Sequence, residues 1–462
     1  MSDTPPPTIG GVSTSTALPD LPTAQPWRAL TAPVPVNAVV PVPGSKSETN
    51  RALVLAALSD LPSVITHGLE ARDTALMRNA LRALGVVIVE SGDQWLVTPP
   101  ERFSGDVVVD CGLAGTVMRF VPVLAALATG PVRFEGDPQA AARPMAPLLD
   151  ALESLGVEVR TDGSPSLPFT LTSSASLRGG LVTVDASTSS QYVSALLLVG
   201  ARFPDGLEVV HVGPPVPSLP HIEMTVAMLR QRGVVVDDSV ADRWRVEPGV
   251  IAAHDVVVEP DLSNAAPFLA AAAVTGGIVT VPHWPAQTHQ PGDLVRAILS
   301  AFGAEVSYFE GALTVKGTNR LHGVDLDLRA ASELTPVVAA LAALADSTTH
   351  IRGVGHVRGH ETDRIAALDV DLTSLGSSVT QTEDGLSVHP KLLGGGPWYT
   401  YADHRMAHAG ALLGLVVPEV VLDDITCTSK TMPEFVTLWT TMIEESVARS
   451  EAVAEIDIEP LL

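Results

Sequence analysis

Apolar and polar residues follow a block pattern that repeats along the chain. Each block holds a helix-like stretch that ends in Leu-Gly or a near variant, and an alternating β-branched run follows the glycine. These glycines are residues 85, 156, 233, 303 and 376, which are 71, 77, 70 and 73 positions apart by subtraction. Because glycine suits the left-handed position after a helix, we expect each of them to end a helix and precede a strand.

Each block also contains an earlier helix-like stretch. The predicted helices cover residues 49–59, 114–129, 190–200, 264–273, 331–345 and 404–415, and the last has a partner near 433–447. The chain therefore divides into six units, each of two helices and several short strands. A unit of ~70 residues is larger than an ordinary solenoid repeat. We therefore expect two domains of similar size, each with three units.

The composition is that of an acidic globular protein. Of 462 residues, 46% are hydrophobic and 17% are charged, and the net charge is −24. This charge argues against nucleic acids and anionic membrane surfaces as partners, because both attract basic proteins. No apolar run reaches the ~18 residues of a membrane span. The chain has two cysteines, Cys111 and Cys427, which fit a reducing compartment rather than a disulfide framework.

The N-terminal segment, residues 1–26, differs from the remainder of the chain. It is rich in Pro, Ser, Thr and Gly, and it lacks both a basic region and an apolar core of the kind that signal peptides carry. We expect it to form a disordered tail.

The first polar cluster, PGSKSETNR, precedes an apolar helix. Gly44 lets the backbone approach a ligand, and Ser45 and Ser47 supply hydroxyl groups. Lys46 and Arg51 add positive charge at the helix N-terminus, where unpaired N–H groups already favour anions. The glycine spacing of a Walker A loop is absent. The cluster predicts an anion site, and a capped helix with a basic first turn is the alternative.

Further polar clusters stand near later helix starts. They are LAGTVMR, ARPM, SSQY, ASELTP, GHETDR, DHRMAH and CTSKTMP. Taken alone, each has an ordinary explanation, such as a tight turn at Gly115, a surface position for Arg143 before a helix that starts at Pro144, or an N-cap at Ser189 and Ser190. Together they gather the following charged residues: Lys46, Arg51, Arg143, Arg364, Arg405, Lys430, Glu333 and Glu361. Such a set fits substrates with several anionic groups and two carboxylates that transfer protons.

A metal site is not expected. His360 and Glu361 are adjacent, as are Asp403 and His404, and adjacent helical residues do not face one ligand. Arg364 stands where the H-E-x-x-H pattern needs its second histidine.

In this order, the eight clusters resemble those of one family, the EPSP synthases or 3-phosphoshikimate 1-carboxyvinyltransferases, over residues 27 to 445. The resemblance implies an α/β (α+β) fold of two similar domains, each of three βαβαββ units, in the inside-out α/β barrel of the enolpyruvyl transferases. The chain would cross twice between the domains. Residues 27–42 and 259–462 would form the first domain and residues 43–258 the second, with the active site in the cleft between them.

The resemblance also implies an activity. The family transfers the enolpyruvyl group of phosphoenolpyruvate to the 5-hydroxyl of shikimate 3-phosphate, through a tetrahedral intermediate, and releases phosphate. This is a step of the shikimate pathway to chorismate and the aromatic amino acids. It requires no metal and no organic cofactor. We expect these two substrates as the partners of a monomer in the cytoplasm.

Family roles carry over to individual positions. Catalysis would involve Glu333 as the base for the 5-hydroxyl, Glu361 as the acid and base at the methylene carbon, and Lys46 beside both substrates. Shikimate 3-phosphate would be held by Lys46, Ser47, Arg51, Ser189, Ser190, Gln191, Ser218, Glu333 and His360. Phosphoenolpyruvate would be held by Lys46, Gly115, Arg143, Gln191, Arg364, Arg405 and Lys430.

Three positions depart from the family pattern. Leu113 stands where many members have Asn, His221 where many have Tyr, and His360 where many have Lys. With His360, part of the positive charge near the substrates would depend on pH. The departures bear on the binding of glyphosate, an inhibitor of sensitive members, more than on the reaction.

Two alternatives remain at this point. The sister enzyme transfers enolpyruvyl to UDP-N-acetylglucosamine and usually carries a reactive cysteine in the loop where Asp137, Pro138 and Gln139 stand here. The second alternative is a catalytically inactive, anion-binding protein on the same scaffold.

Overall fold

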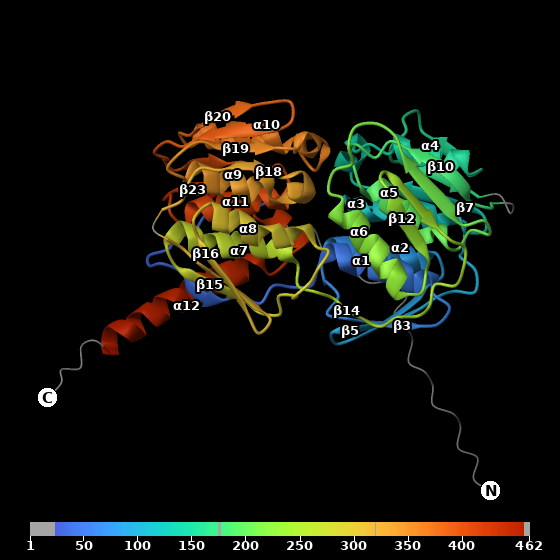
Figure 1. Cartoon of the computed structure of the whole chain (residues 1–462), viewed down its shortest axis with the longest axis horizontal. Coiled ribbons are helices and arrows are strands. Elements are labelled where there is room, and N and C mark those ends of the chain that lie inside the picture. The colour runs from blue at the N-terminus through green and yellow to red at the C-terminus, as the bar shows by residue number, and fades with distance from the viewer. Residues whose placement is uncertain (1–23, 174–176, 319, 457–462) are drawn as a thin grey trace, which may run out of the picture.

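The computed structural model describes residues 24–173, 177–318 and 320–456, which form two lobes of similar size (Figure 1). Most of the expected N-terminal tail lies outside the described residues, and residues 24–26 are exposed and without regular structure.

The lobe at the right of Figure 1 contains three units. The first has α1 (Lys46–Leu58), β3 (Ser63–Thr66), α2 (Arg72–Ala83), β4 (Val87–Ser91) and β5 (Gln94–Thr98), and takes its first strand from β14 (Val256–Val257). The second has β6 (Val107–Asp110), α3 (Gly115–Ala125), β7 (Pro131–Glu135), α4 (Ala146–Ser154), β8 (Glu158–Thr161) and β9 (Phe169–Thr172). The third has β10 (Gly180–Val184), α5 (Gln191–Gly200), β11 (Leu207–His211), α6 (Pro220–Gln231), β12 (Val236–Val240) and β13 (Arg243–Val246).

The other lobe repeats the plan. Its first unit has β2 (Asn37–Val39), α7 (Leu262–Thr275), β15 (Ile278–Val281), α8 (Val295–Ala301), β16 (Glu305–Phe309) and β17 (Ala312–Lys316). The next has β18 (Asp325–Asp327), α9 (Thr335–Ala343), β19 (Thr349–Arg352), α10 (Arg364–Ser374), β20 (Ser378–Gln381) and β21 (Leu386–His389). The last has β22 (Gly396–Trp398), α11 (His404–Gly414), β23 (Val420–Leu422) and α12 (Phe435–Ile456), with β1 (Trp27–Arg28). Short 3₁₀ turns are η1 (Pro138–Ala142), η2 (Pro291–Leu294), η3 (Arg329–Leu334), η4 (Gly355–Gly359) and η5 (Thr426–Lys430).

The sheets confirm the βαβαββ pattern in five units. In each four-stranded sheet the first two strands of the unit are parallel, and the final pair joins antiparallel, as in the order β6-β7-β9-β8. The sixth unit differs, because its sheet has the order β1-β23-β22, and the chain continues into α12 instead of a closing strand pair. The N-terminal strand β1 therefore supplies an edge that the unit itself lacks.

The five predicted cap glycines are confirmed. Gly85, Gly156, Gly233, Gly303 and Gly376 have φ of 97°, 98°, 75°, 103° and 107°, and a strand follows each of them. Three predicted helix starts are wrong. α9 begins at Thr335 and not at 331, because the 3₁₀ turn η3 precedes it. α1 begins at Lys46, three residues early, because Ser45 caps it through a bond from the Glu48 N–H. α4 begins at Ala146, so Pro147 and not Pro144 occupies its first turn.

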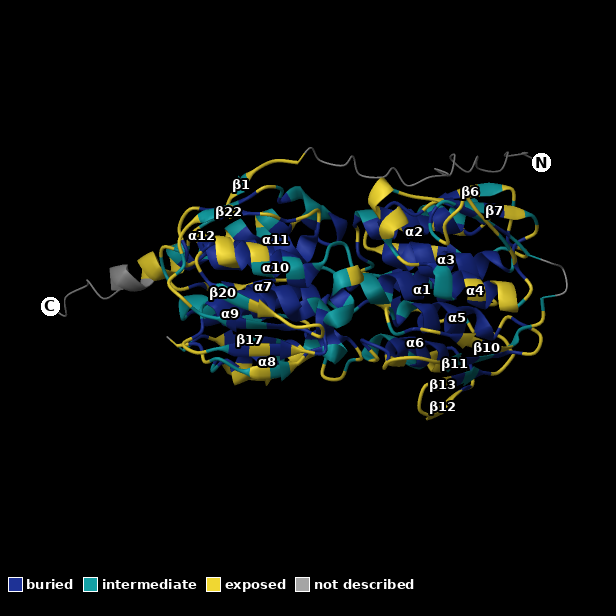
Figure 2. Ribbon diagram, turned by 90° about the horizontal axis from the view of Figure 1, so that it is seen from above, coloured by how far each residue is buried: buried dark blue, intermediate teal, exposed yellow. Residues whose placement is uncertain are grey.

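The helices lie inside the sheets in both lobes, which is the inside-out arrangement. All eleven residues of α3 are buried, as are residues Thr49–Leu58 of α1, and Figure 2 shows the central helices mostly dark blue. A helix that is apolar on every face requires such surroundings. The Ala-rich helices α7 and α9 occupy the same place in the other lobe, as their composition predicted.

The hydrophobic residues form two separate cores. One core contains buried residues from Ala52 to Val258, and the other contains Ala29 to Val40 and then Leu262 to Ile443. The chain thus leaves one core and returns to it. The boundaries at residues 42/43 and 258/259 themselves stay predictions.

The two crossing segments pair with each other. The Ser45 N–H donates to the Glu259 carbonyl at 2.7 Å, and the Asp261 N–H donates to the Pro43 carbonyl at 2.8 Å. Because α1 and α7 begin directly after these bonds, their N-termini lie together at the junction of the lobes. The fold therefore places polar helix starts from both domains at one junction.

The cap glycines allow a test of whether the left-handed φ at these positions requires glycine. An added Cβ at Gly156 would meet no atom within 4 Å, so Gly156→Ala should destabilise the protein through its φ of 98° alone, by at least about 1 kcal/mol. Gly249→Ala is the matched control, because its Cβ also meets nothing within 4 Å and its φ is ordinary. Urea unfolding followed by circular dichroism measures both. Equal stability of the two variants would contradict the requirement.

Candidate active site

A cavity of about 340 Å³ lies between the two domains. Helix starts from both domains reach it, those of α1, α3 and α5 on one side and α10 and α11 on the other. Thirteen of the predicted site residues line its wall: Lys46, Ser47, Gly115, Arg143, Ser189, Ser190, Gln191, Ser218, Glu333, His360, Glu361, Arg364 and Arg405. Residues separated by more than 350 positions in the sequence thus share one small volume, which suits a small polar substrate.

The domains touch at one side of this cavity. The Ser218 N–H donates to the Arg329 carbonyl at 2.9 Å, and the Ser218 and Ser332 hydroxyls are 3.3 Å apart. Ser218 has a left-handed φ of 51°. This residue therefore both lines the cavity and joins the domains.

A pair of guanidinium groups surrounds the start of α3. A Cβ at Gly115 would lie 3.0 Å from Arg143 Nη2 and 3.1 Å from Arg119 Nη1, so only glycine leaves room for both. Arg143 also donates to the Leu113 carbonyl at 3.1 Å, a backbone contact that any residue at 113 supplies. Two cations beside free helix N–H groups form a strong anion site.

Arg119 is a site residue that sequence reasoning missed. It is buried, its Nε has no hydrogen-bond partner among the described residues, and burial followed by Arg143 lowers its pKa to about 10. It remains a cation at neutral pH. The sequence feature that could have identified Arg119 is its position one helical turn after Gly115, on the same face of the predicted helix.

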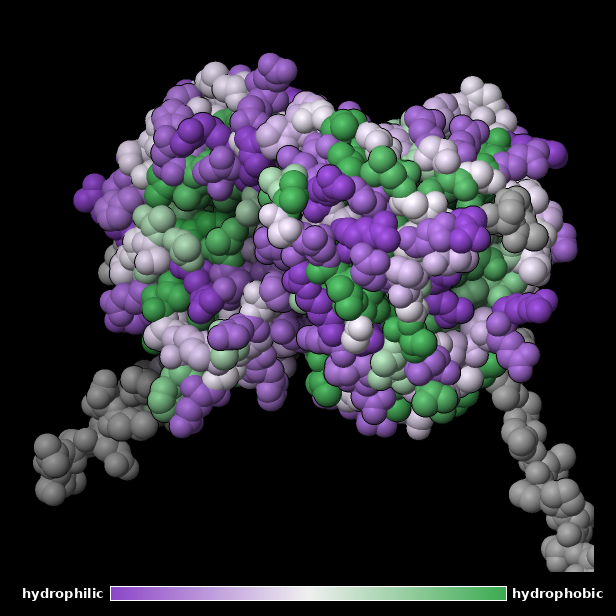
Figure 3. Space-filling model, turned by 45° about the vertical axis from the view of Figure 1, so that its right-hand side comes forward, coloured by the Kyte–Doolittle hydropathy of each residue, from purple (hydrophilic) through white to green (hydrophobic). Residues whose placement is uncertain are grey.

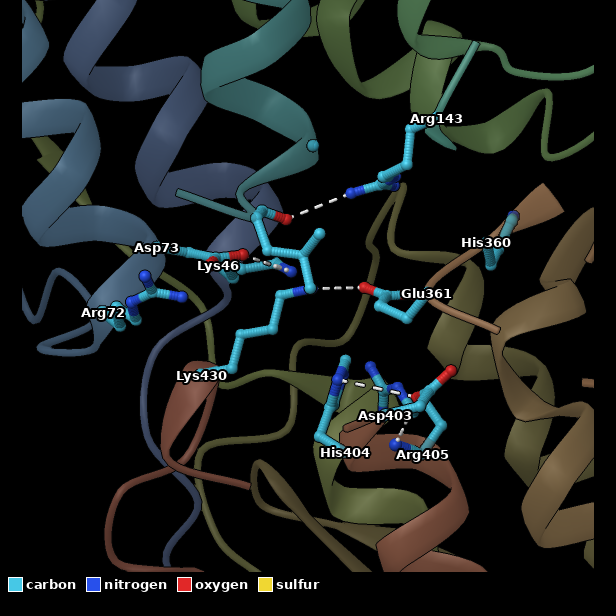
Figure 4. A network of polar contacts seen from close by, with 12 residues as sticks. Lys46, Arg72, Asp73, Arg143, His360, Glu361, Asp403, His404, Arg405 and Lys430 are labelled. Carbon is cyan, nitrogen blue, oxygen red and sulfur yellow. Dashed lines mark hydrogen bonds and ion pairs between the residues drawn. The ribbon is translucent and has the colours of Figure 1, made fainter. Parts of the chain in front are cut away.

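Glu361 lies in a cluster of cations (Figure 4). Its two carboxylate oxygens accept bonds from Lys430 Nζ and, at 3.1 Å, from Arg364 Nη2. Burial opposes ionisation, but Lys430, Arg364 and Arg143 together hold the pKa of Glu361 well below its usual range. Lys430 itself does not line the cavity, because it lies behind this carboxylate. Without a ligand, Glu361 is therefore ionised.

Asp403 holds Arg364 in place. It accepts bonds from Arg364 Nε at 2.8 Å and Nη2 at 3.1 Å, and it caps α11 through the Arg405 N–H at 2.9 Å. Its neighbour His404 also lines the cavity. Both residues belong to the DHRMAH cluster, and neither had been given a role.

Lys46 projects from the first turn of α1. Its Nζ lies 3.1 Å from the buried carboxylate of Asp73, and its N–H donates to Asp261 Oδ2 at 3.2 Å. One bond comes from its own domain and the other from the second crossing segment. Asp73 was not predicted as a partner of Lys46, because nothing in its sequence position in the first turn of a helix distinguishes it from other acidic residues.

Glu333 lies in the short turn η3 and is half-buried in the cavity wall. Its Oε1 accepts from the Ser263 hydroxyl at 3.0 Å, and the Ser263 carbonyl accepts from Arg405 Nη1 at 2.7 Å. Burial raises the pKa of Glu333. Asp261 caps α7 through the Asn264 N–H at 2.9 Å, and the role of Ser263 between two candidate site residues was not predicted.

The histidines of the site are neutral, which corrects the expected pH dependence at His360. Burial and then Arg364 hold the pKa of His360 well below its usual value, and its Nδ1 accepts from Arg364 Nη1 at 3.0 Å. Burial lowers the pKa of His356 to about 4 and that of His221 to about 3, with nearby cations adding to both shifts. None of the three changes charge near pH 7.

The hydroxyl groups at the start of α5 are available to a ligand. Ser190 occupies the N-cap position but makes no side-chain cap bond, so its expected alternative role as a cap is not seen. Gln191 Oε1 is buried and lacks a hydrogen-bond partner among the described residues. Ser189 Oγ accepts only weakly, from the Gln191 N–H at 3.3 Å. Neutral donors here fit a phosphate group.

Arg51 is the predicted residue whose position differs most from expectation. It is buried within its own domain and does not line the cavity. Its guanidinium donates to the Ser47 carbonyl at 2.9 Å, the Thr225 hydroxyl at 2.7 Å and the His221 carbonyl at 3.0 Å. It therefore fixes two segments of the wall, and it reaches a ligand only by exchanging one of these bonds.

The structure argues against the sister enzyme that uses a reactive cysteine. Cys111 is buried, and burial raises its pKa above the usual range. The loop that carries a cysteine in the sister enzyme here has Asp137, which accepts from Arg72 at 2.8 and 3.0 Å. No thiolate is therefore placed at that loop.

The described part of the chain holds no group of three or more His, Cys, Asp or Glu side chains that could bind a metal ion. Within the same ranges, no helix has the length and apolar character needed to cross a membrane.

The comparisons with known proteins agree with one another. The family model of EPSP synthase (3-phosphoshikimate 1-carboxyvinyltransferase) matches residues 30–439. The chain is 53% identical over 428 residues to the 3-phosphoshikimate 1-carboxyvinyltransferase of Mycobacterium ulcerans (strain Agy99), covering 91% of this chain and 99% of that one. Sequence similarity therefore extends over nearly the whole of both proteins.

Solved structures show the same fold. Two structures of EPSP synthase from Acinetobacter baumannii match with TM-scores of 0.75 and 0.74 at 24% and 23% identity. Each match covers 90% of this chain and 98% of the other. Together with the family model and the close relative, they show that this chain belongs to the EPSP synthase family.

Proposed function

We propose that this protein transfers the enolpyruvyl group of phosphoenolpyruvate to the 5-hydroxyl of shikimate 3-phosphate and releases phosphate. The observation that carries the proposal is the cavity between the domains, where Glu333 and Glu361 share one wall with Lys46 and four arginines. The two carboxylates supply a base and an acid, and the cations match the charges of two phosphorylated substrates.

The two anion sites divide the substrates between them. The hydroxyls of Ser189 and Ser190 and the amide of Gln191 would hold the phosphate of shikimate 3-phosphate. Arg119 and Arg143 around Gly115, with Arg364 and Arg405 opposite, would hold phosphoenolpyruvate. Lys46 lines the same cavity and would contact both substrates.

Substrate binding would protonate Glu361. In the free protein, Lys430, Arg364 and Arg143 keep this carboxylate ionised. The anionic groups of phosphoenolpyruvate compete for these cations and weaken their effect on Glu361, so burial then raises its pKa. The acid is thus generated where and when the enol carbon needs a proton.

The reaction then follows from the two carboxylates. Glu361 donates a proton to the methylene carbon, the 5-oxygen bonds to the adjacent carbon, and Glu333 accepts the hydroxyl proton. In the resulting tetrahedral intermediate, Glu361 removes a proton from the new methyl group. At the same time, the bond between the tetrahedral carbon and the bridging phosphate oxygen breaks, and phosphate leaves. Enclosure in a buried cleft strengthens the effect of the fixed cations on the leaving phosphate.

The direct test is phosphate release from the purified protein with phosphoenolpyruvate. Release that requires shikimate 3-phosphate is the expected result. Release only with UDP-N-acetylglucosamine would favour the sister reaction, and no release with either acceptor would favour the inactive scaffold.

Glu361→Gln tests the acid and base role. The amide keeps the shape of the side chain but cannot donate or accept the proton, so turnover should fall by ~10²-fold or more. Shikimate 3-phosphate should still bind within a few-fold of the wild-type affinity, as measured by calorimetry. Turnover close to that of the wild type would remove Glu361 from the mechanism.

Ser263→Ala tests the support of Glu333. Loss of the hydroxyl removes a bond to the charged form of Glu333, which costs ~1.5–3 kcal/mol and should lower turnover by roughly 10- to 100-fold. That bond also lowers the pKa of Glu333. Its loss raises the pKa, so the acidic limb of the pH–rate profile should move to higher pH.

The same variant contains an internal control. Arg405 contacts the Ser263 backbone carbonyl, which alanine retains, so the KM for phosphoenolpyruvate should stay within about twofold. A changed KM with an unmoved pH profile would assign Ser263 to the other substrate site.

A further inference from the structure

A second cavity, of about 660 Å³, lies at the junction of the domains. The first crossing segment lines it with Val42, Pro43 and Gly44, and the second lines it with residues 257–260. The wall is completed by residues 67–70 and by Gly92, Asp93, Trp95, His283 and Glu434. It shares no residue with the substrate cavity and is large enough for a small organic molecule.

The wall of this hinge cavity is apolar and acidic. Val42, Pro43, Leu69, Val257, Val258 and Pro260 provide apolar surface. The titratable side chains are Glu70, Asp93, Glu259, Glu434, His67 and His283, and the described wall contains no lysine or arginine. An apolar body that carries one positive charge complements such a wall, whereas the anionic substrates of the other cavity would be repelled.

Two of the carboxylates are free to receive a cation. The Glu434 side chain is exposed and has no hydrogen bond or ion pair with any described residue. Asp93 faces only His67, at 3.3 Å, and both side chains are more than half exposed. By contrast, Arg78 holds Glu70 at 2.6 Å, so that carboxylate is already neutralised.

Short backbone links connect this wall to the substrate site. Glu259 accepts the Ser45 N–H at its carbonyl, 2.7 Å away, and its own N–H donates to Glu48 Oε2 at 2.8 Å. Ser45 and Glu48 flank Lys46 in the first turn of α1. A change in the angle between the domains must therefore alter both cavities together.

We propose that the hinge cavity is a second ligand site, selective for an organic ammonium ion with an apolar body, and that its occupancy is coupled to the arrangement of the domains. The cavity has this shape while the domains touch at Ser218, so a ligand that fills it stabilises the touching arrangement. The coupling half of the proposal rests on the proposed function, and the binding half does not.

The binding half is tested by calorimetric titration of the full chain with 2-phenylethylammonium chloride. Saturable binding is expected, and the neutral analogue 2-phenylethanol should bind at least about threefold more weakly, as loss of one exposed ion pair implies. Glu434→Gln should cause a similar loss. Val257→Trp fills the cavity from a side chain that is 69% exposed, so it should abolish binding without disturbing the core.

Glu451→Gln is the matched control, because it removes an exposed carboxylate far along α12 and should leave binding unchanged. The proposed site would be overturned if Glu434→Gln and Glu451→Gln bound 2-phenylethylammonium with equal affinity. It would also be overturned if Val257→Trp bound this probe as tightly as the wild type. Equal affinities of 2-phenylethylammonium and 2-phenylethanol would overturn its charge selectivity. Absence of saturation would overturn both.

The coupling half is tested by repeating the titration with saturating shikimate 3-phosphate. Linkage requires that two ligands favouring one domain arrangement tighten each other, so the ammonium probe should bind at least about threefold more tightly. Unchanged affinity while shikimate 3-phosphate is bound would overturn the coupling. If shikimate 3-phosphate itself fails to bind, the proposed function fails, and the probe titration alone still decides the hinge site.

Discussion

The structure depends on holding buried cations close together in a cleft of an acidic protein. Arg364, Arg405 and Lys430 are nearly inaccessible to water, and each needs a compensating partner. Asp403 and Glu361 supply two of these partners, and the Ser263 carbonyl supplies the third. The carboxylates hold the cations in fixed positions, and the cations in turn keep Glu361 ionised until a substrate anion competes for them.

This balance explains why the acidic character of the protein does not prevent anion binding. Hydrophilic residues on the remaining surface are mixed with hydrophobic ones, as the scattered purple and green regions of Figure 3 show for one face. Two of the four lysines of the chain, Lys46 and Lys430, belong to the candidate site, together with four arginines of the cavity wall. Local charge in a buried cavity thus outweighs the net charge of −24.

The crossing segments serve both the fold and the site. Their pairing through Ser45 and Asp261 brings the starts of α1 and α7 together, and each residue also caps its own helix. The same few residues separate the substrate cavity from the hinge cavity. Movement between the domains would have to bend these two short segments, which are joined by the backbone bonds from Ser45 to Glu259 and from Asp261 to Pro43.

The sequence by itself determined the repeat and the glycines that end the helices, and it named thirteen of the residues that line the cavity. Glycine caps such as Gly85 are local features, because a left-handed φ follows from the residue type and its neighbours. The tertiary structure alone decided which polar groups face the ligand. Arg51 binds Thr225 inside its own domain, Asp73 contacts Lys46, and Ser263 donates to Glu333. The pKa of His360 lies well below its usual value, so this residue does not titrate near pH 7. Burial and partners from distant segments set all of these properties. Periodicity and motif spacing carry no information about such contacts, so only the folded chain reveals them.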